Sequence, residues 1–146
     1  MGGWAVGGIT TLASGRRVTA GVQGNPSNTG TTNRPDQVGN PNLPRGQHRL
    51  ERWFNTEAFV TNAPFTYGNA ARNKIAAPGR VNLDFALYKH IPITERVRLQ
   101  FRAECFNLTN TPHFGAPNAT VGTNQYGVIS GAGDPRIFQL ALRLLF

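Results

Sequence analysis

The segment RVNLDFALYKHIPITERVRLQFRAECFNL (residues 80–108) alternates apolar and polar residues along two runs, 81–91 and 96–107. A period of two residues is typical of a β-strand with two unlike faces. The runs are joined by Pro-Ile-Thr-Glu at 92–95, which is short enough to turn between antiparallel strands. The segment therefore predicts a hairpin that is apolar on one face and polar on the other.

The same alternation returns at the end of the chain, in IFQLALRLLF (residues 137–146). Upstream, residues 4–23 predict a weaker hairpin with its turn near 13–16. Residues 25–80 are rich in Pro, Gly and Asn, and they predict a very long loop. We therefore predict an all-β fold, an antiparallel meander of about four to six strands with long loops.

Composition limits the chemistry of the chain. Its 15 Lys and Arg residues against 7 Asp and Glu residues give a formal net charge of +8, which favours anionic partners without choosing among nucleic acid, lipid and lipopolysaccharide. The single Cys105 excludes an intramolecular disulfide, and the three histidines lack metal-ligand spacing. Neither a phosphate-binding glycine loop nor a Ser/His/Asp set is recognisable. We expect no enzyme activity, no metal and no cofactor.

Alternating strands are common in soluble sandwiches, but three features favour a membrane barrel. The patterned runs are about 10 to 12 residues long, close to what a tilted strand needs to cross a bilayer. Short and long connections alternate, as do the periplasmic turns and external loops of outer-membrane barrels. The last strand ends on Phe146, and an aromatic ring is favoured at a membrane interface.

A resemblance to a known family is carried by GRVNLDFALYKHIPITERVRLQFRAECFNLTNTPHFGAPNATVG (79–122) and GVISGAGDPRIFQLALRLLF (127–146). Together they resemble the C-terminal end of TonB-dependent outer-membrane receptors of the Oar-like, carboxypeptidase-regulatory-domain-containing group. Upstream, NRPDQVG, RWFNTEAF and TYGNAARN resemble loops of the same group, so the likeness covers about residues 4–146.

The resemblance implies a barrel of about 22 strands with an N-terminal plug, which takes up large nutrients or siderophore-type ligands with energy from the TonB complex. This chain has about five candidate strands, fewer than the roughly eight of the smallest barrels, and neither a plug nor a signal peptide is recognisable. We therefore interpret 1–146 as the C-terminal part of the barrel domain, a fragment that is not transport-competent alone and lies in the outer membrane within the full-length receptor. Its expected partners are the remaining barrel and plug, outer-membrane lipid and lipopolysaccharide, the barrel-assembly machinery and, through the missing N-terminal part, the TonB complex, with no nucleic acid.

The resemblance also assigns roles to residues of the patterned strands. The signal that the barrel-assembly machinery recognises is expected at Phe138, Leu140, Leu142, Leu144 and Phe146. The residues expected to face lipid are Val81, Leu83, Phe85, Leu87, Val97, Leu99 and Phe101. The residues expected to face the lumen are Arg96, Arg98, Gln100, Arg102 and Glu104. With the C-terminus in the periplasm, the turn 92–95 is periplasmic, and the stretches 25–80 and 109–136 are external.

Two alternatives remain open. A soluble basic β-module would bind nucleic acid or other polyanions and would lose affinity steeply with salt. An adhesin-like structural barrel, formed by several copies of the chain, would give a discrete heat-modifiable oligomer in detergent.

Overall fold

The computed structural model describes residues 2–30 and 33–146. Residue 1 of the predicted barrel section and residues 31–32 of the predicted loop lie outside this description. The chain forms two compact units. The sheet unit comprises residues 2–13, 80–113 and 133–146, and the loop unit comprises residues 14–79 and 114–132.

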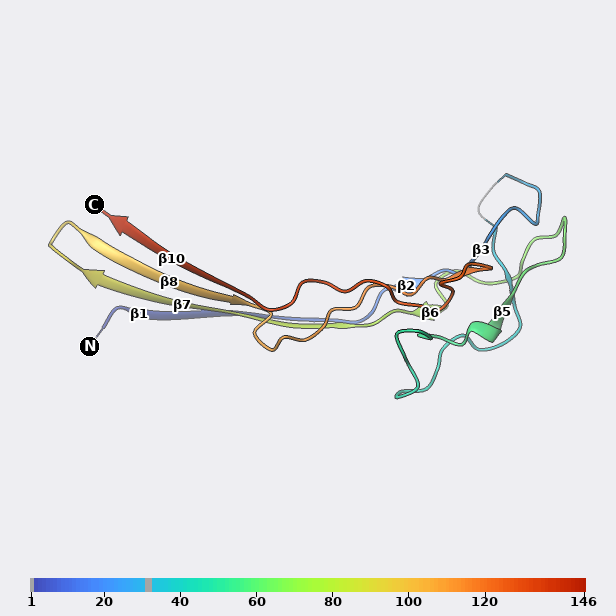
Figure 1. The fold of residues 1–146 in the computed structure, drawn as a ribbon, viewed down its shortest axis with the longest axis horizontal. Coiled ribbons are helices and arrows are strands. Elements are labelled where there is room, and N and C mark those ends of the chain that lie inside the picture. Colours follow the sequence, from blue (N-terminus) through green and yellow to red (C-terminus); the bar gives the residue numbers. More distant parts are fainter. Residues whose placement is uncertain (1, 31–32) are drawn as a thin grey trace. The chain divides into compact units, whose positions relative to one another are not determined.

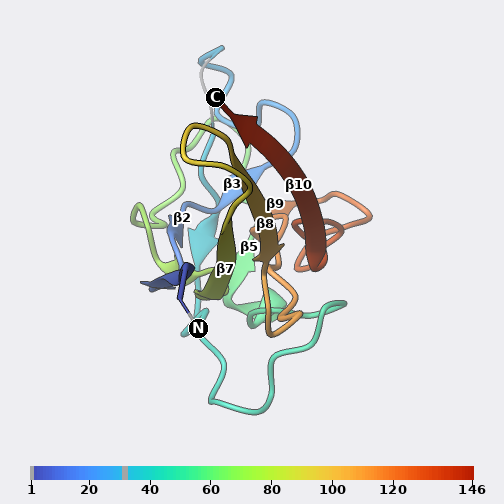
Figure 2. The same ribbon diagram turned by 90° about the vertical axis from the view of Figure 1, so that its left-hand side faces the viewer.

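The sheet unit is a four-stranded antiparallel sheet in the order β1-β7-β8-β10 (Figures 1 and 2). Its strands are β1 (Trp4–Ala13), β7 (Arg80–Pro92), β8 (Arg98–Phe106) and β10 (Ile137–Leu145). The predicted all-β antiparallel class is confirmed. The sheet does not close, because the outer strands β1 and β10 pair only with β7 and β8, respectively.

The predicted hairpin over residues 4–23 is wrong. β1 pairs with β7 over its whole length, from Trp4 opposite Lys89 to Ala13 opposite Arg80. The next strand, β2 (Arg17–Val18), does not pair with β1 either, because it pairs with β6 (Ile75–Ala76). A Cβ atom at Gly15 would lie 1.7 Å from the carbonyl oxygen of Ala77, so only glycine permits this close approach.

The two strands of the β7–β8 hairpin have slightly different bounds from those that the alternating pattern predicts. β7 continues through Pro92, and β8 begins at Arg98 rather than at Arg96. Arg96 and Val97 therefore lie in the turn, where the backbone amides of Ile93 and Thr94 both donate to the carbonyl of Val97. These two bonds close the hairpin.

The loop unit contains short regular elements. Within the stretch 25–80, which the sequence predicts as a loop, they are β4 (Asp36–Gln37), the 3₁₀ helix η1 (Thr56–Ala58), β5 (Phe59–Val60) and β6. Outside that stretch they are β2, β3 (Gly21–Val22) and β9 (Thr120–Val121). β3 pairs with β9 in parallel, and β4 pairs with β5 antiparallel.

A small aromatic core holds the loop unit together. The Phe54 ring is buried, and it meets the rings of Phe59 and Tyr126 edge-on, with centroids 6.4 and 5.4 Å apart. Around them pack Ala20, Ala58, Ala70, Ile75 and Ala119. The aromatic residues of the stretches predicted as loops thus form a core, which the high Pro, Gly and Asn content of those stretches does not indicate.

Candidate functional site

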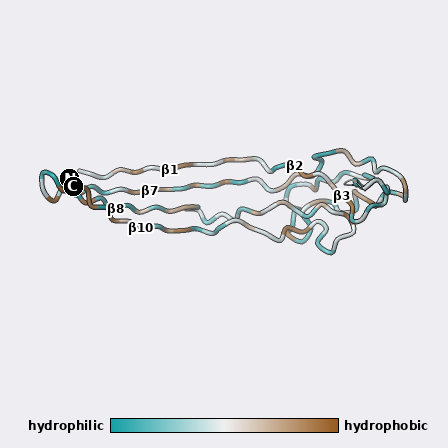
Figure 3. The backbone as a smooth tube through the Cα atoms, turned by 90° about the horizontal axis from the view of Figure 1, so that it is seen from above, coloured by the Kyte–Doolittle hydropathy of each residue, from teal (hydrophilic) through white to brown (hydrophobic). Residues whose placement is uncertain are grey.

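The strand register gathers most of the apolar residues of all four strands on one face, here called the apolar face. The large apolar residues that lie on the opposite face are Ile9, Phe106, Ile137 and Leu145. Residues directly opposite each other in antiparallel strands share a face, and Phe101 lies opposite both Lys89 and Leu142. The face contains Val6, Leu12, Val81, Leu83, Phe85, Leu87, Leu99, Phe101, Ala103, Cys105, Phe138, Leu140, Leu142 and Leu144. Figure 3 shows hydrophobic and hydrophilic residues following one another along these strands.

Much of the apolar face is uncovered. Leu140 and Leu142 are each 69% exposed, Phe138 is 67% exposed, and Leu144 and the terminal Phe146 are also exposed. Among the residues predicted to face lipid, Val81 and Phe85 are exposed, while Leu83, Leu87, Leu99 and Phe101 are half-buried. Val97 lies in the turn. A contiguous apolar surface of this kind marks contact with a membrane or a partner.

Lys89 is the charged residue that interrupts the apolar face at the end nearest the β7–β8 turn. Its ammonium lies 4.7 Å from the ring centroid of Trp4 and donates a 2.8 Å hydrogen bond to the carbonyl of Gly2. Tryptophan and a lysine that extends toward water are typical of a membrane–water interface. The sequence analysis missed this pair, because it did not pair β1 with β7.

The opposite side of the sheet, here called the polar face, carries the residues predicted to face the lumen. Gln100 and Arg102 lie opposite His90 and Tyr88 across the β7–β8 ladder. Arg102 forms an ion pair with Glu104, and its guanidinium lies 5.8 Å from the Tyr88 ring centroid. Arg98, Gln100, Arg102 and Glu104 thus share one face, and Arg96 lies outside the strand.

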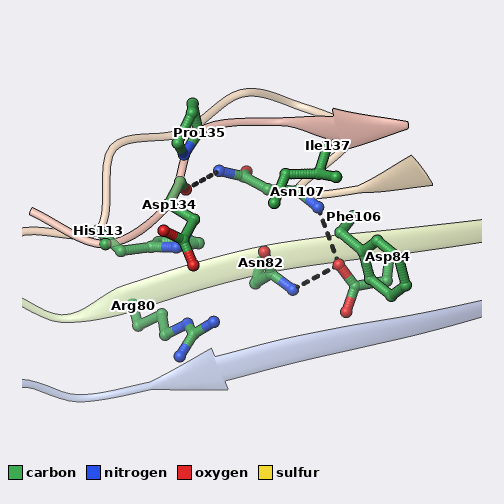
Figure 4. A pocket seen from close by; sticks show the side chains of 10 residues that line it. Arg80, Asn82, Asp84, Phe106, Asn107, His113, Asp134, Pro135 and Ile137 are labelled. Atoms are coloured by element: carbon green, nitrogen blue, oxygen red, sulfur yellow. Dashed lines mark hydrogen bonds between the residues drawn. The ribbon is translucent and has the colours of Figure 1, made fainter. Parts of the chain in front are cut away.

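At the other end of the polar face lies a pocket, where β7 begins, β8 ends and β10 begins. Its volume is about 370 Å³, near the lower limit of small-molecule pockets, about 300 to 1,000 Å³. Its lining consists of Gly133 and the nine residues labelled in Figure 4, namely Arg80, Asn82, Asp84, Phe106, Asn107, His113, Asp134, Pro135 and Ile137.

A hydrogen-bond network fixes the floor of this pocket. The Asp84 carboxylate accepts bonds of 2.9 Å from the backbone amide of Asn107 and from the side-chain amide of Asn82 (Figure 4). Asn82 and Asn107 are each only 5% exposed. This network holds the end of β8 beside β7, and it therefore fixes the residues that form the floor of the pocket.

The turn after β8 depends on asparagines in the left-handed backbone region. Asn107 has φ +53° and Asn110 has φ +50°, a conformation that asparagine tolerates better than most residues. The Asn107 side chain exchanges two 3.0 Å hydrogen bonds with the backbone of Thr111, and the Asn110 side chain accepts from the amide of Arg136. The ends of the long connection between β8 and β10 are thereby tied together.

The remaining polar groups of the pocket are available to a ligand. Among the residues that the structure describes, none makes a hydrogen bond or ion pair with the guanidinium of Arg80 or the carboxylate of Asp134. His113 Nε2 lies 3.0 Å from the carbonyl oxygen of Val81, so it donates there and leaves Nδ1 as an acceptor. The pocket therefore offers the guanidinium of Arg80, the carboxylate of Asp134, the second oxygen of Asp84 and one ring acceptor.

The sequence analysis singled out none of these pocket residues. The alternation places Asn82 and Asp84 on the polar side of their strand, but His113 and Asp134 come from the connection between β8 and β10. Residues 2–30 and 33–146 contain no group of three or more His, Cys, Asp or Glu residues that could hold a metal. The polar groups that line the pocket are suited to binding a ligand.

The part of the chain that the structure describes contains no helix long and apolar enough to cross a membrane. No curated protein and no solved structure matches the chain. Comparison with protein families matches residues 1–139 to one family model, described as an outer membrane beta barrel domain.

Proposed function

Because the chain belongs to the family of outer-membrane β-barrel domains, we propose that it forms the C-terminal section of a TonB-dependent receptor barrel. The receptor would take up large nutrients or siderophore-type ligands. One observation carries the proposal, namely a register that puts most of the apolar residues of four long strands on one face and most of the polar residues on the other. This division is what a barrel wall between lipid and an aqueous lumen requires.

The two free edges of the sheet support a role within a larger barrel. In lipid every backbone N–H and C=O group must be paired, so a spanning sheet has to close. The sheet has four strands, against about eight in the smallest closed barrels. The strands that would complete it belong to the rest of the receptor, and the four strands alone would not transport.

The polar face supports contact with a plug. Arg98 and Arg102 are exposed, and Glu104 and Gln100 lie beside them. Buried or lumenal charges in membrane proteins are paired or hydrated, so this face suits either a plug surface or an aqueous path. The TonB complex would contact the N-terminal part of the receptor, which includes the plug. We propose no catalytic step for this chain.

The Trp4–Lys89 pair indicates a membrane interface at one end of the sheet, and the resemblance, in which the C-terminus lies in the periplasm, decides which interface this is. We place this end of the sheet at the periplasmic interface, with the 93–97 turn and Phe146, where the assembly machinery would read the final strand. The pocket then lies at the external end of the lumen. The loop unit, which carries eight Lys and Arg residues against three Asp and Glu residues, would contact lipopolysaccharide and arriving ligands.

The proposal is tested in cells that produce the chain. An antibody against residues 137–146 should detect, in outer membranes, a polypeptide far longer than this chain, and removing TonB should abolish ligand accumulation while leaving the amount of that polypeptide unchanged. A band of the chain's own size that forms a heat-modifiable oligomer would support the oligomeric structural barrel instead. A water-soluble protein with salt-sensitive polyanion binding would support the soluble module.

A further inference from the structure

We propose that the pocket at the end of the polar face binds a small zwitterion, namely a free amino acid or dipeptide with an apolar side chain, between Arg80 and Asp134. The proposal concerns binding alone. It holds or fails whether or not the chain takes part in TonB-dependent transport.

Two unpaired opposite charges carry the argument. Arg80 and Asp134 both line the pocket, and no ion pair within 4 Å joins them to each other or to another described residue. Figure 4 shows both side chains in the same hollow, on β7 and on the segment before β10. A ligand with one carboxylate and one ammonium would satisfy both groups, because guanidinium–carboxylate and ammonium–carboxylate bonds are charge-assisted.

The second carboxylate, Asp84, is already hydrogen-bonded through one of its two oxygens. The bonds that it accepts from Asn82 and Asn107 both end on Oδ1, whereas no described residue donates to the side chain of Asp134, so Asp134 is the carboxylate with both oxygens free for a ligand. The formal charges of Arg80, Asp84 and Asp134 sum to −1. A simple anion is therefore disfavoured, and a simple cation would leave Arg80 unpaired beside it.

The remaining lining fits the rest of such a ligand. His113 Nδ1 can accept a second bond from an ammonium, since Nε2 is held by Val81. Phe106 and Ile137, which are both exposed at the pocket, provide apolar contact for a side chain. The volume of about 370 Å³ limits the ligand to a small molecule.

The test uses radiolabelled L-alanyl-L-phenylalanine and outer membranes that hold the protein in its folded form. An uncoupler is present throughout, so energy-dependent uptake adds nothing to the bound label. We expect saturable binding that weakens at least about tenfold when the dipeptide is N-acetylated or C-amidated. Arg80→Gln should weaken binding similarly, and so should Asp134→Asn.

Two matched variants control for charge and folding. Arg143→Gln removes an arginine from the polar face outside the pocket, and Glu95→Gln removes a carboxylate from the turn; both should bind as the unaltered protein does. Arg80→Lys keeps the charge but loses the planar fork, so binding should fall between that of the unaltered protein and Arg80→Gln. Equal binding of the capped and uncapped dipeptides, or no binding by the folded unaltered protein, would overturn the proposal. Loss of binding in the control variants would also overturn it.

Discussion

The Asp84 carboxylate of β7 accepts the backbone amide of Asn107, 23 residues later in the chain, at 2.9 Å. This bond closes the end of the β7–β8 pair opposite the hairpin turn. It also places Asn107 where its side chain can hold Thr111. One short polar network therefore fixes the strand end, the following turn and the floor of the pocket.

Replacing Asn107 should destabilise the sheet end. Asn107→Ala removes three side-chain hydrogen bonds, two with the backbone of Thr111 and one of 3.5 Å to the carbonyl of Asp134, from a buried position with φ +53°, and we expect a loss of about 2 kcal/mol in the free energy of unfolding. The measurement is urea denaturation of the folded protein in lipid vesicles. Asn107→Gly is the matched variant, because it restores the backbone preference but not the hydrogen bonds, so it should lose less. Equal stability of all three proteins would contradict the assigned role.

Trp4 and Lys89 should be energetically coupled. In a double-mutant cycle of Trp4→Ala and Lys89→Met, the cation–π contact at 4.7 Å predicts a coupling free energy of about 0.5 to 1 kcal/mol. The same vesicle denaturation measures it. Strictly additive effects would show that the two side chains do not interact.

Replacing Phe65 with glycine should stabilise the loop unit. It occupies the third position of the Ala63–Thr66 turn with φ +62°, and its side chain is 78% exposed, so little packing offsets the strain. Phe65→Gly should stabilise the loop unit by about 1 kcal/mol, measured as a raised melting temperature. Tyr67→Gly is the matched control, because Tyr67 is 77% exposed without a positive φ, and it should not stabilise.

Tyr126 should make the loop unit sensitive to high pH. Burial raises its pKa from 10.0 to about 12, so the folded state holds the phenol proton more tightly than the unfolded state does. The contribution of this pKa difference to the free energy of unfolding is fully present below pH 10, and it is lost as the pH rises from 10 to about 12. Thermal unfolding across this range should show the loss in the unaltered protein and a smaller loss in Tyr126→Phe.

At pH 7, Tyr126→Phe should reduce the stability of the folded protein little. The Tyr126 hydroxyl is buried without a hydrogen-bond partner among the described residues, so its removal forfeits no bond and relieves desolvation. A melting temperature equal to or above that of the unaltered protein is expected. A large drop would mean that the hydroxyl has a partner in the folded protein.

The three patterned strands could be predicted from the sequence because each repeats a clean two-residue alternation over nine residues or more. β1 could be recognised as extended but not paired correctly. Its Gly7 and Gly8 weaken the pattern, and its partner β7 begins 67 positions after β1 ends. The aromatic core of the loop unit was hidden because Phe54, Phe59 and Tyr126 meet only through tertiary packing.

The pocket could not be predicted for a related reason. Arg80, His113 and Asp134 come from three separate segments, and nothing in their spacing indicates that they converge. Asn107 and Asn110 look like ordinary loop residues until their positive φ angles are known. The roles in facing lipid, facing the lumen and directing assembly stay predictions from the resemblance.

The most direct test of the account measures which face of β10 contacts lipid. In a Cys105→Ala background, single cysteines at positions 139 to 144 are treated with a water-soluble thiol reagent in intact outer membranes. We expect positions 139, 141 and 143 to react and positions 140, 142 and 144 to be protected, because the latter share the apolar face. Equal reactivity at all six positions would contradict a membrane-spanning sheet.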